Sequence, residues 1–219
     1  MTFSLSHRKP IDVGHVGIDQ NDLPSIDAGP IDLRGWFPDD RRDRPLELEI
    51  GCGKGTFLVQ EATERPEVNF IGLEYANAYW RYAADRCRRR DLQNVRIVHA
   101  EAASFVQYRV PDQTFRQIHI YFPDPWPKKR HHKRRLIQTE FLRQLHHALE
   151  PAGLVRITTD HDDYFQWMLE QVAEVADLFA PQPFEPPQSA DRGELVGSNF
   201  ERKYRREGRL LHAMILRKL

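Results

Sequence analysis

The segment that most constrains the fold is Leu46-Glu-Leu-Glu-Ile50, followed directly by Gly51-Cys-Gly53-Lys-Gly55. The alternation of residues 46–50 predicts a strand. The glycines that follow predict a turn whose backbone passes close to a ligand. Residues from Thr56 to about 64 predict a short helix. A dinucleotide fingerprint needs Gly or Ala at position 56, and a Walker loop needs Gly-Lys-Ser/Thr, so both fit badly. The unit therefore favours a nucleoside cofactor, with a plain strand-to-helix turn as the alternative.

Strands and helices continue to alternate after this unit. Apolar runs predict strands over residues 68–74, 95–98, 115–122 and 154–158, and helical spacing predicts helices over 76–91, 136–149 and 164–175. Residues 181–187 are proline-rich, 200–207 predict a short helix, and 209–216 predict a last strand. The order predicts an α/β fold: a doubly wound, mostly parallel sheet covered on both faces, with an antiparallel final strand.

The 219 residues, 40% of them hydrophobic, are enough for one sizeable core. Residues 1–44 are rich in Asp, Gly and Pro and show no sustained periodicity. We therefore expect a variable, partly disordered N-terminal arm over 1–44 and one domain over 45–219. No apolar run reaches the ~20 residues of a membrane span, and the first ten residues do not resemble a signal peptide. The two cysteines, Cys52 and Cys87, favour a reducing cytoplasm.

Three acidic residues follow three successive predicted strands. Glu49 lies at the end of the first, where a buried carboxylate is costly unless a cation meets it. S-adenosylmethionine would bring an ammonium group to that place. Glu74 ends the second strand, where an acid takes the two ribose hydroxyls in such folds, and Glu101 follows the third and could reach the adenine amino group.

The segment Tyr121-Phe-Pro-Asp-Pro-Trp-Pro127 places one carboxylate between prolines beside aromatic rings, which suits a planar base. Residues 128–135 then hold six Lys or Arg and two His. The net charge of the chain is zero, which excludes a uniformly basic nucleic-acid binder, so this local block is notable. Like charges at this density repel one another unless a polyanion is near, which favours a phosphate backbone. The adjacent histidine pairs lack zinc spacing, and we expect no metal.

These motifs together resemble the bacterial tRNA (guanine-N7-)-methyltransferase family. The resemblance rests on residues 49–55, 70–74, 122–126 with the basic tail, 158–160 and 198–201, and it runs from about Leu46 to the C-terminus. It implies a Rossmann-like class I S-adenosylmethionine-dependent methyltransferase that forms 7-methylguanosine at position 46 of the tRNA variable loop. Glu101, where Asp is usual, and Ser198, where Thr is usual, keep the chemistry. We expect a cytoplasmic monomer or homodimer without membrane contact.

The resemblance also implies roles for individual residues. Asp124 would lie at both the cofactor and the reaction centre. The cofactor would be held by Glu49, Gly51, Gly53, Gly55, Glu74, Glu101 and Asp124. The guanine or its neighbourhood would be contacted by Lys128, Asp160, Ser198, Asn199, Phe200 and Glu201. The tRNA would be gripped by Arg130, His131, His132, Lys133, Arg134 and Arg135.

Guanine N7 carries an exposed lone pair, so methyl transfer needs no prior deprotonation. Asp124 therefore fits an electrostatic and positioning role better than that of an obligatory base. Asp160 or Glu201 could accept both donors of the guanine edge, a pairing that adenine would lose. Three alternatives stay open: an adenine amino-methyltransferase acting on RNA, a non-catalytic RNA-binding module with a methyltransferase fold, and, more distantly, a dehydrogenase.

Overall fold

One sheet of eight strands, in the order β1-β4-β3-β2-β5-β6-β8-β7, organises residues 10–219, the part of the chain that the computed structural model describes. The strands are β1 (Gly17–Asp19), β2 (Leu46–Ile50), β3 (Asn69–Glu74), β4 (Val95–His99), β5 (Phe115–Tyr121), β6 (Leu149–Thr159), β7 (Phe179–Gln182) and β8 (His212–Lys218). Strands β1 to β6 pair in parallel, whereas β8 runs antiparallel to β6 and β7. The predicted mostly parallel sheet with an antiparallel final strand is confirmed.

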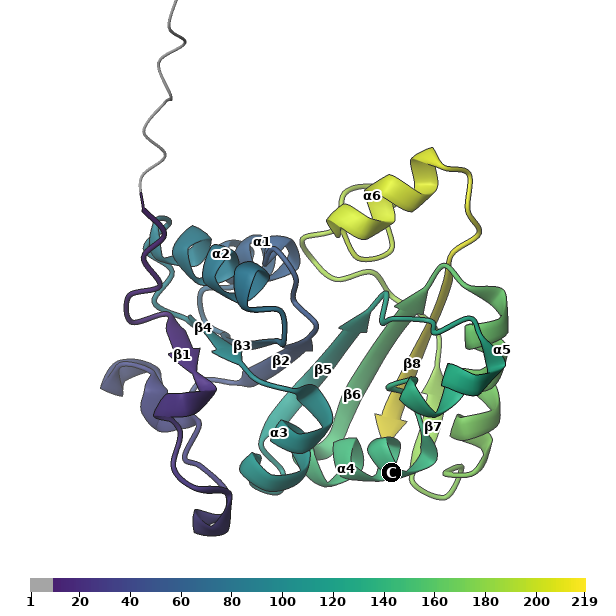
Figure 1. Cartoon of the computed structure of the whole chain (residues 1–219), viewed down its shortest axis with the longest axis horizontal. Helices are drawn as coiled ribbons and strands as arrows, with labels where there is room; N and C mark the ends of the chain where they lie inside the picture. The colour runs from purple at the N-terminus through teal and green to yellow at the C-terminus, as the bar shows by residue number, and fades with distance from the viewer. Residues whose placement is uncertain (1–9) are drawn as a thin grey trace, which may run out of the picture.

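Helices cover both faces of this sheet. They are α1 (Thr56–Glu64), α2 (Asn77–Arg88), α3 (Ala102–Arg109), α4 (Thr139–Ala148), α5 (Asp162–Ala173) and α6 (Asn199–Arg206). Buried side chains of α3, α4 and α5 share one hydrophobic cluster, and those of α1 and α2 share a second. The sheet is therefore a buried layer between two helical layers (Figure 1). No helix within residues 10–219 is long and apolar enough to cross a membrane.

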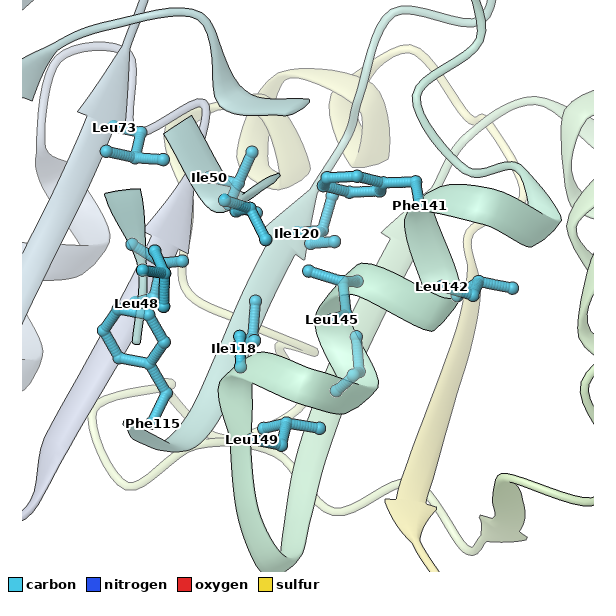
Figure 2. Close-up of a cluster of buried hydrophobic side chains, with 14 of the residues drawn as sticks. Leu48, Ile50, Leu73, Phe115, Ile118, Ile120, Phe141, Leu142, Leu145 and Leu149 are labelled. Atoms are coloured by element: carbon cyan, nitrogen blue, oxygen red, sulfur yellow. The ribbon is translucent and has the colours of Figure 1, made fainter. Parts of the chain in front are cut away.

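The larger cluster fixes the central strands. Figure 2 shows Ile118 and Ile120 of β5 facing Phe141 and Leu145 of α4, and all four side chains are buried. Full burial of such a side chain contributes about 1.5–3 kcal/mol. This packing holds the carboxyl ends of β2 and β5 next to each other, and α6 lies over that edge of the sheet (Figure 1).

Residues 10–44, for which we expected a variable, partly disordered arm, pack against the domain. Gly17–Asp19 adds β1 to the sheet edge by pairing with β4, and Val16, Leu33 and Phe37 are buried. The segment gives no periodic pattern because it is built from short 3₁₀ turns, and its buried side chains lie between these turns. Residues 1–9, part of the same prediction, lie outside the described residues.

Four further elements differ from the prediction. The sequence analysis missed α3 and β7, two short elements of eight and four residues. The helix predicted over 136–149 begins at Thr139, after the cap residue Gln138. Leu149, the last residue of that predicted helix, is the first residue of β6.

Candidate active site

The glycine turn after β2 takes a conformation that other residues rarely adopt. Gly51, Gly53 and Gly55 have φ angles of 74°, 53° and 65°, all in the left-handed region. The Gly53 N–H donates to Oε2 of Glu74 at 2.8 Å, which ties the turn to the end of β3. A side chain at Gly55 would meet Ala83 of α2 at 3.1 Å, so this glycine serves packing between the turn and α2.

A cavity of about 1310 Å³ opens where β2, β3 and β5 end. Its lining includes nine of the residues predicted for the site, namely Glu49, Gly51, Gly53, Glu74, Glu101, Asp124, Ser198, Asn199 and Phe200, together with Arg134 of the basic block. Gly55, Lys128, Asp160, Glu201 and the rest of the basic block do not line it. Residues more than 140 positions apart in sequence thus share one space.

Two carboxylates on the same face of β2 have opposite surroundings. The buried carboxylate of Glu47 is paired with Arg65, with Arg116 at 2.7 Å and with His119 at 3.0 Å. Burial alone would raise the pKa of Glu47, but His119 and Arg65 hold it well below its usual range. The fold therefore neutralises the Glu47 charge by itself.

Glu49 has no such compensation. The residue is 5% exposed, and its Oε2 atom is buried with no hydrogen-bond partner among the described residues. Burial raises the pKa of Glu49 to about 8, and repulsion from Glu74 and Glu61 adds to the shift. An unpaired buried carboxylate that faces a cavity fits a ligand carrying a cation. The ammonium group of S-adenosylmethionine meets this requirement.

The other two acids carry backbone contacts. Glu74 accepts hydrogen bonds from the N–H groups of Gly53 and Ala76, both at 2.8 Å. Glu101 caps α3 by accepting from the N–H groups of Ala103 and Ser104. Each carboxylate still lines the cavity, so each is held in a fixed orientation toward it.

We expect Glu74→Ala to weaken binding of S-adenosylhomocysteine by about 2–3 kcal/mol, because a charge-assisted contact is lost and the glycine turn loses its anchor. Binding of tRNA should stay close to that of the parent. Calorimetry with S-adenosylhomocysteine measures the change. Glu64→Ala, at the exposed end of α1, is the control. Equal affinities of the two variants would remove Glu74 from the site.

The loop after β5 is strained around Asp124. Phe122 and Trp126, two residues on either side, have φ angles of 54° and 44°, which cost large side chains about 1–3 kcal/mol each. Phe122 lies edge-on to Tyr204 of α6, with ring centroids 5.5 Å apart. Asp124 itself is exposed on the cavity wall. The strained loop thus presents one carboxylate to the cavity between two fixed aromatic rings.

The N-terminus of α6 forms the opposite wall. Ser198 caps the helix by accepting from the Glu201 N–H at 3.1 Å. The Asn199 side chain donates to Oγ1 of Thr56 at 2.7 Å, which fastens α6 to α1. Phe200 is 47% exposed and approaches the glycine turn, with 3.8 Å between its ring and the Cβ position of Gly53. An exposed ring on a cavity wall can stack on a planar base.

Glu201 does not face the cavity, contrary to the expectation that it contacts the base. Its buried carboxylate accepts from the backbone N–H groups of Leu195, Val196 and Gly197 and pairs with Arg205 at 2.7 Å. Glu201 therefore holds the turn before α6. The Asp160 carboxylate, the other candidate for reading guanine, is paired with Arg209 at 2.5 Å outside the cavity lining.

Arg135 also departs from its predicted role. Its side chain is 1% exposed, pairs with Asp163 and donates to the Pro125 carbonyl at 2.9 Å. The guanidinium also lies over the rings of Tyr164 and Trp167, so Arg135 anchors the strained loop to α5. The preceding residues form a 3₁₀ helix, Lys129–Arg134. In this helix the side chains of His131 and His132 are half-buried, and the four cations are exposed: Lys129, Arg130, Lys133 and Arg134.

Sequence reasoning missed several cavity residues. Tyr75 and Tyr79 flank the start of α2, while Arg202, Lys203 and Arg206 lie on α6. The sequence signal for the tyrosines was their recurrence in and just before an arginine-rich helix. The helical pattern accounted for that segment, so no site was inferred from it. Lys203 and Arg206 belong to a helix that is almost wholly polar, another sign of an exposed, charged wall.

Residues 43–213 match the family model Methyltransf_4, described as "Putative methyltransferase". The tRNA (guanine-N(7)-)-methyltransferase of Alkalilimnicola ehrlichii is 36% identical over 192 residues, which cover 86% of this chain and 78% of the relative. That of Halorhodospira halophila is 36% identical over 199 residues, covering 90% and 82%. The chain belongs to the tRNA (guanine-N7-)-methyltransferase family. Its cavity residues can therefore be interpreted as those of a family member.

Solved structures agree on the fold. The tRNA (m1A58) methyltransferase of Aquifex aeolicus superposes with a TM-score of 0.52 at 15% identity, covering 80% of this chain and 62% of that one. An rRNA methylase from Streptococcus thermophilus gives a TM-score of 0.53 at 14% identity, covering 81% and 88%. These likenesses confirm the Rossmann-like class I methyltransferase fold of this family member.

Proposed function

We propose that this family member transfers a methyl group from S-adenosylmethionine to N7 of a guanine in the variable loop of tRNA, at position 46, and forms 7-methylguanosine. The observation that carries the proposal is that the unpaired Glu49 carboxylate and the exposed Asp124 carboxylate line one cavity. One acid suits the cationic end of the cofactor, and the other suits a base that becomes cationic.

The residues of the cavity fit this cofactor. When bound, S-adenosylmethionine supplies an electrophilic methyl group on a sulfonium. Glu49 would bind its ammonium group, Glu74 the ribose hydroxyls and Glu101 the adenine amino group, while the glycine turn lets the backbone come close. Within residues 10–219 no cluster of three or more His, Cys, Asp or Glu could hold a metal ion.

Asp124 would act on the substrate side. Guanine N7 attacks with its own lone pair, and positive charge moves onto the imidazole ring of the base. A fixed carboxylate near that ring favours the charge that develops in the transition state. The φ angles of Phe122 and Trp126 support this role, because strained angles persist only where surrounding contacts hold the loop in place.

The proposed product can be tested directly. A bulk tRNA pool is methylated with labelled cofactor and then digested to nucleosides. Label in 7-methylguanosine is the expected outcome. Label in an N-methylated adenosine would replace the proposal by the amino-methyltransferase alternative, and absence of label despite binding of S-adenosylhomocysteine would overturn it. Mapping the labelled position within one tRNA tests the variable loop.

The exposed cations before Arg135 should dominate the salt dependence of tRNA binding. Each lost phosphate contact flattens the slope of log affinity against log salt by about 0.7–0.9 units. Replacing Arg130, Lys133 and Arg134 with alanine should therefore flatten it by about 2 units. Fluorescence anisotropy over a series of salt concentrations measures the slope.

A matched control removes three exposed arginines far from the cavity, Arg42, Arg143 and Arg217. This control variant should keep the slope of the parent. Binding of S-adenosylhomocysteine should be unchanged in both triple variants. A parental slope in the variant lacking Arg130, Lys133 and Arg134 would show that the basic block does not meet the tRNA.

A further inference from the structure

A second hollow, of about 470 Å³, lies beside the active-site cavity. It is surrounded by four cations from the glycine turn and from the end of α2, namely Lys54, Arg86, Arg89 and Arg90. The ring of Tyr82 and the amide of Asn199 also line it. Two of these residues, Lys54 and Asn199, also line the active-site cavity. The hollow therefore adjoins the site, and no residue of the basic block lines it.

Hydrogen bonds fix the border between the two spaces. Nη1 of Arg86 donates to the Lys54 carbonyl at 3.0 Å and to Oγ1 of Thr56 at 2.8 Å. The same Thr56 oxygen accepts from Asn199 at 2.7 Å. A single hydroxyl thus joins α2, α1 and the N-terminus of α6, so the hollow has defined walls in the free protein.

The charges around the hollow leave it positive. Asp85, its one acid, is 6% exposed, and its carboxylate pairs with Arg88 at 2.9 Å and with Arg89 at 2.7 Å. Within residues 10–219, the Arg90 guanidinium makes one hydrogen bond, to the Arg86 carbonyl at 3.3 Å. The hollow is thus lined by four cations and by one acid that is already paired. The cations repel one another, and a polyanion would relieve that repulsion.

Exposed tyrosines lead from one space to the other. Tyr75 and Tyr79, which line the active-site cavity, are 69% and 48% exposed. Tyr82, three residues further along α2, is 47% exposed and lines the second hollow. Arginine beside exposed rings is the combination that binds single-stranded nucleic acid, since bases stack on the rings and cations meet the phosphates.

We propose that the end of α2, with Lys54, binds the phosphates of the tRNA strand next to the target guanine, and that Tyr82 stacks on an unpaired base there. We call Lys54, Tyr82, Arg86, Arg89 and Arg90 the α2 surface. This proposal rests on the proposed function because it takes the substrate of the same site. Helix α2 packs on β1, β3 and β4, whereas the basic block is anchored to α5 at the other end of the sheet (Figure 1). The tRNA is therefore held on both sides of the cavity.

The test replaces two arginines that do not touch the glycine turn. Arg89→Ala with Arg90→Ala should flatten the salt slope of tRNA binding by about 1.5 units and weaken binding about tenfold at physiological salt. The control variant Arg143→Ala with Arg217→Ala also loses two exposed arginines and should match the parent. Binding of S-adenosylhomocysteine should be unchanged in both.

A second variant tests whether the loss comes from the charges. Arg89→Lys with Arg90→Lys keeps both charges and should restore the parental slope. Tyr82→Ala should weaken tRNA binding about tenfold without changing the slope. If the double alanine variant binds tRNA as the parent does, with an equal slope, the α2 surface does not contact RNA. Failure of this proposal is distinct from failure of the proposed function, because the parent protein would still methylate tRNA at guanine N7.

Discussion

Replacing Asp124 with asparagine is expected to lower the single-turnover methylation rate roughly 10²–10³-fold while the protein stays folded. The amide is nearly isosteric with the carboxylate, so the strained loop keeps its shape and the main loss is negative charge beside the base. Rates are measured with saturating tRNA and cofactor. Asp112→Asn, in an exposed turn before β5, is the matched control and should keep the parental rate.

The pH dependence then separates two roles for Asp124. An electrostatic role requires that the asparagine variant be slow at every pH and indifferent to added buffer base. A general-base role requires that buffer bases partly rescue it. Rescue would overturn the electrostatic assignment, and a parental rate would show that Asp124 takes no part in the reaction.

Binding of S-adenosylhomocysteine is expected to release close to one proton at pH 7, and Glu49→Gln is expected to abolish that release. The pKa of about 8 keeps the Glu49 carboxyl protonated in the free protein at pH 7. The ammonium group of the ligand favours the ionised form, so binding expels the proton. Calorimetry in buffers of different ionisation enthalpy counts the protons. Equal release by parent and variant would show that the proton comes from elsewhere.

The same carboxyl group affects the stability of the cofactor-free protein. Because the pKa of Glu49 is raised on folding, the folded state binds the extra proton, and stability falls as pH rises from about 4.5 to 8. The shift corresponds to about 3–5 kcal/mol over that range. Glu49→Gln should lack this loss, so its advantage over the parent in denaturant unfolding should grow toward pH 8. An advantage that does not change with pH would contradict the buried, unpaired state of Glu49.

The order of strands and helices could be predicted from the sequence because each long element has a clear period. Both carboxylates of β2 show why the site was harder. Glu47 and Glu49 occupy equivalent positions in the alternating strand, yet only Glu49 is left unpaired. The partners of Glu47 come from the residue that follows α1 and from β5, and no local pattern indicates such distant contacts. The strand-end position of Glu49, by contrast, could be recognised from the turn that follows it.

Arg135 and Glu201 illustrate the same limit. Both residues belong to segments of charged residues, and the residues next to them line the cavity or are exposed. The side chains of Arg135 and Glu201 themselves are buried. The residue type within a motif does not show which way a side chain points in a 3₁₀ turn or at a helix cap. The roles of Lys128, Asp160 and Glu101 stay predictions, and the variants at Glu49 and Glu74 test the other two cofactor acids.

The buried carboxylate of Glu201 has a consequence for the thermodynamics of substrate binding. It accepts three backbone N–H groups ahead of α6, so this wall is already folded in the free protein. A prefolded segment loses little conformational entropy when tRNA arrives. The heat-capacity change of binding should then reflect only the surface buried between protein and RNA, without a contribution from coupled folding.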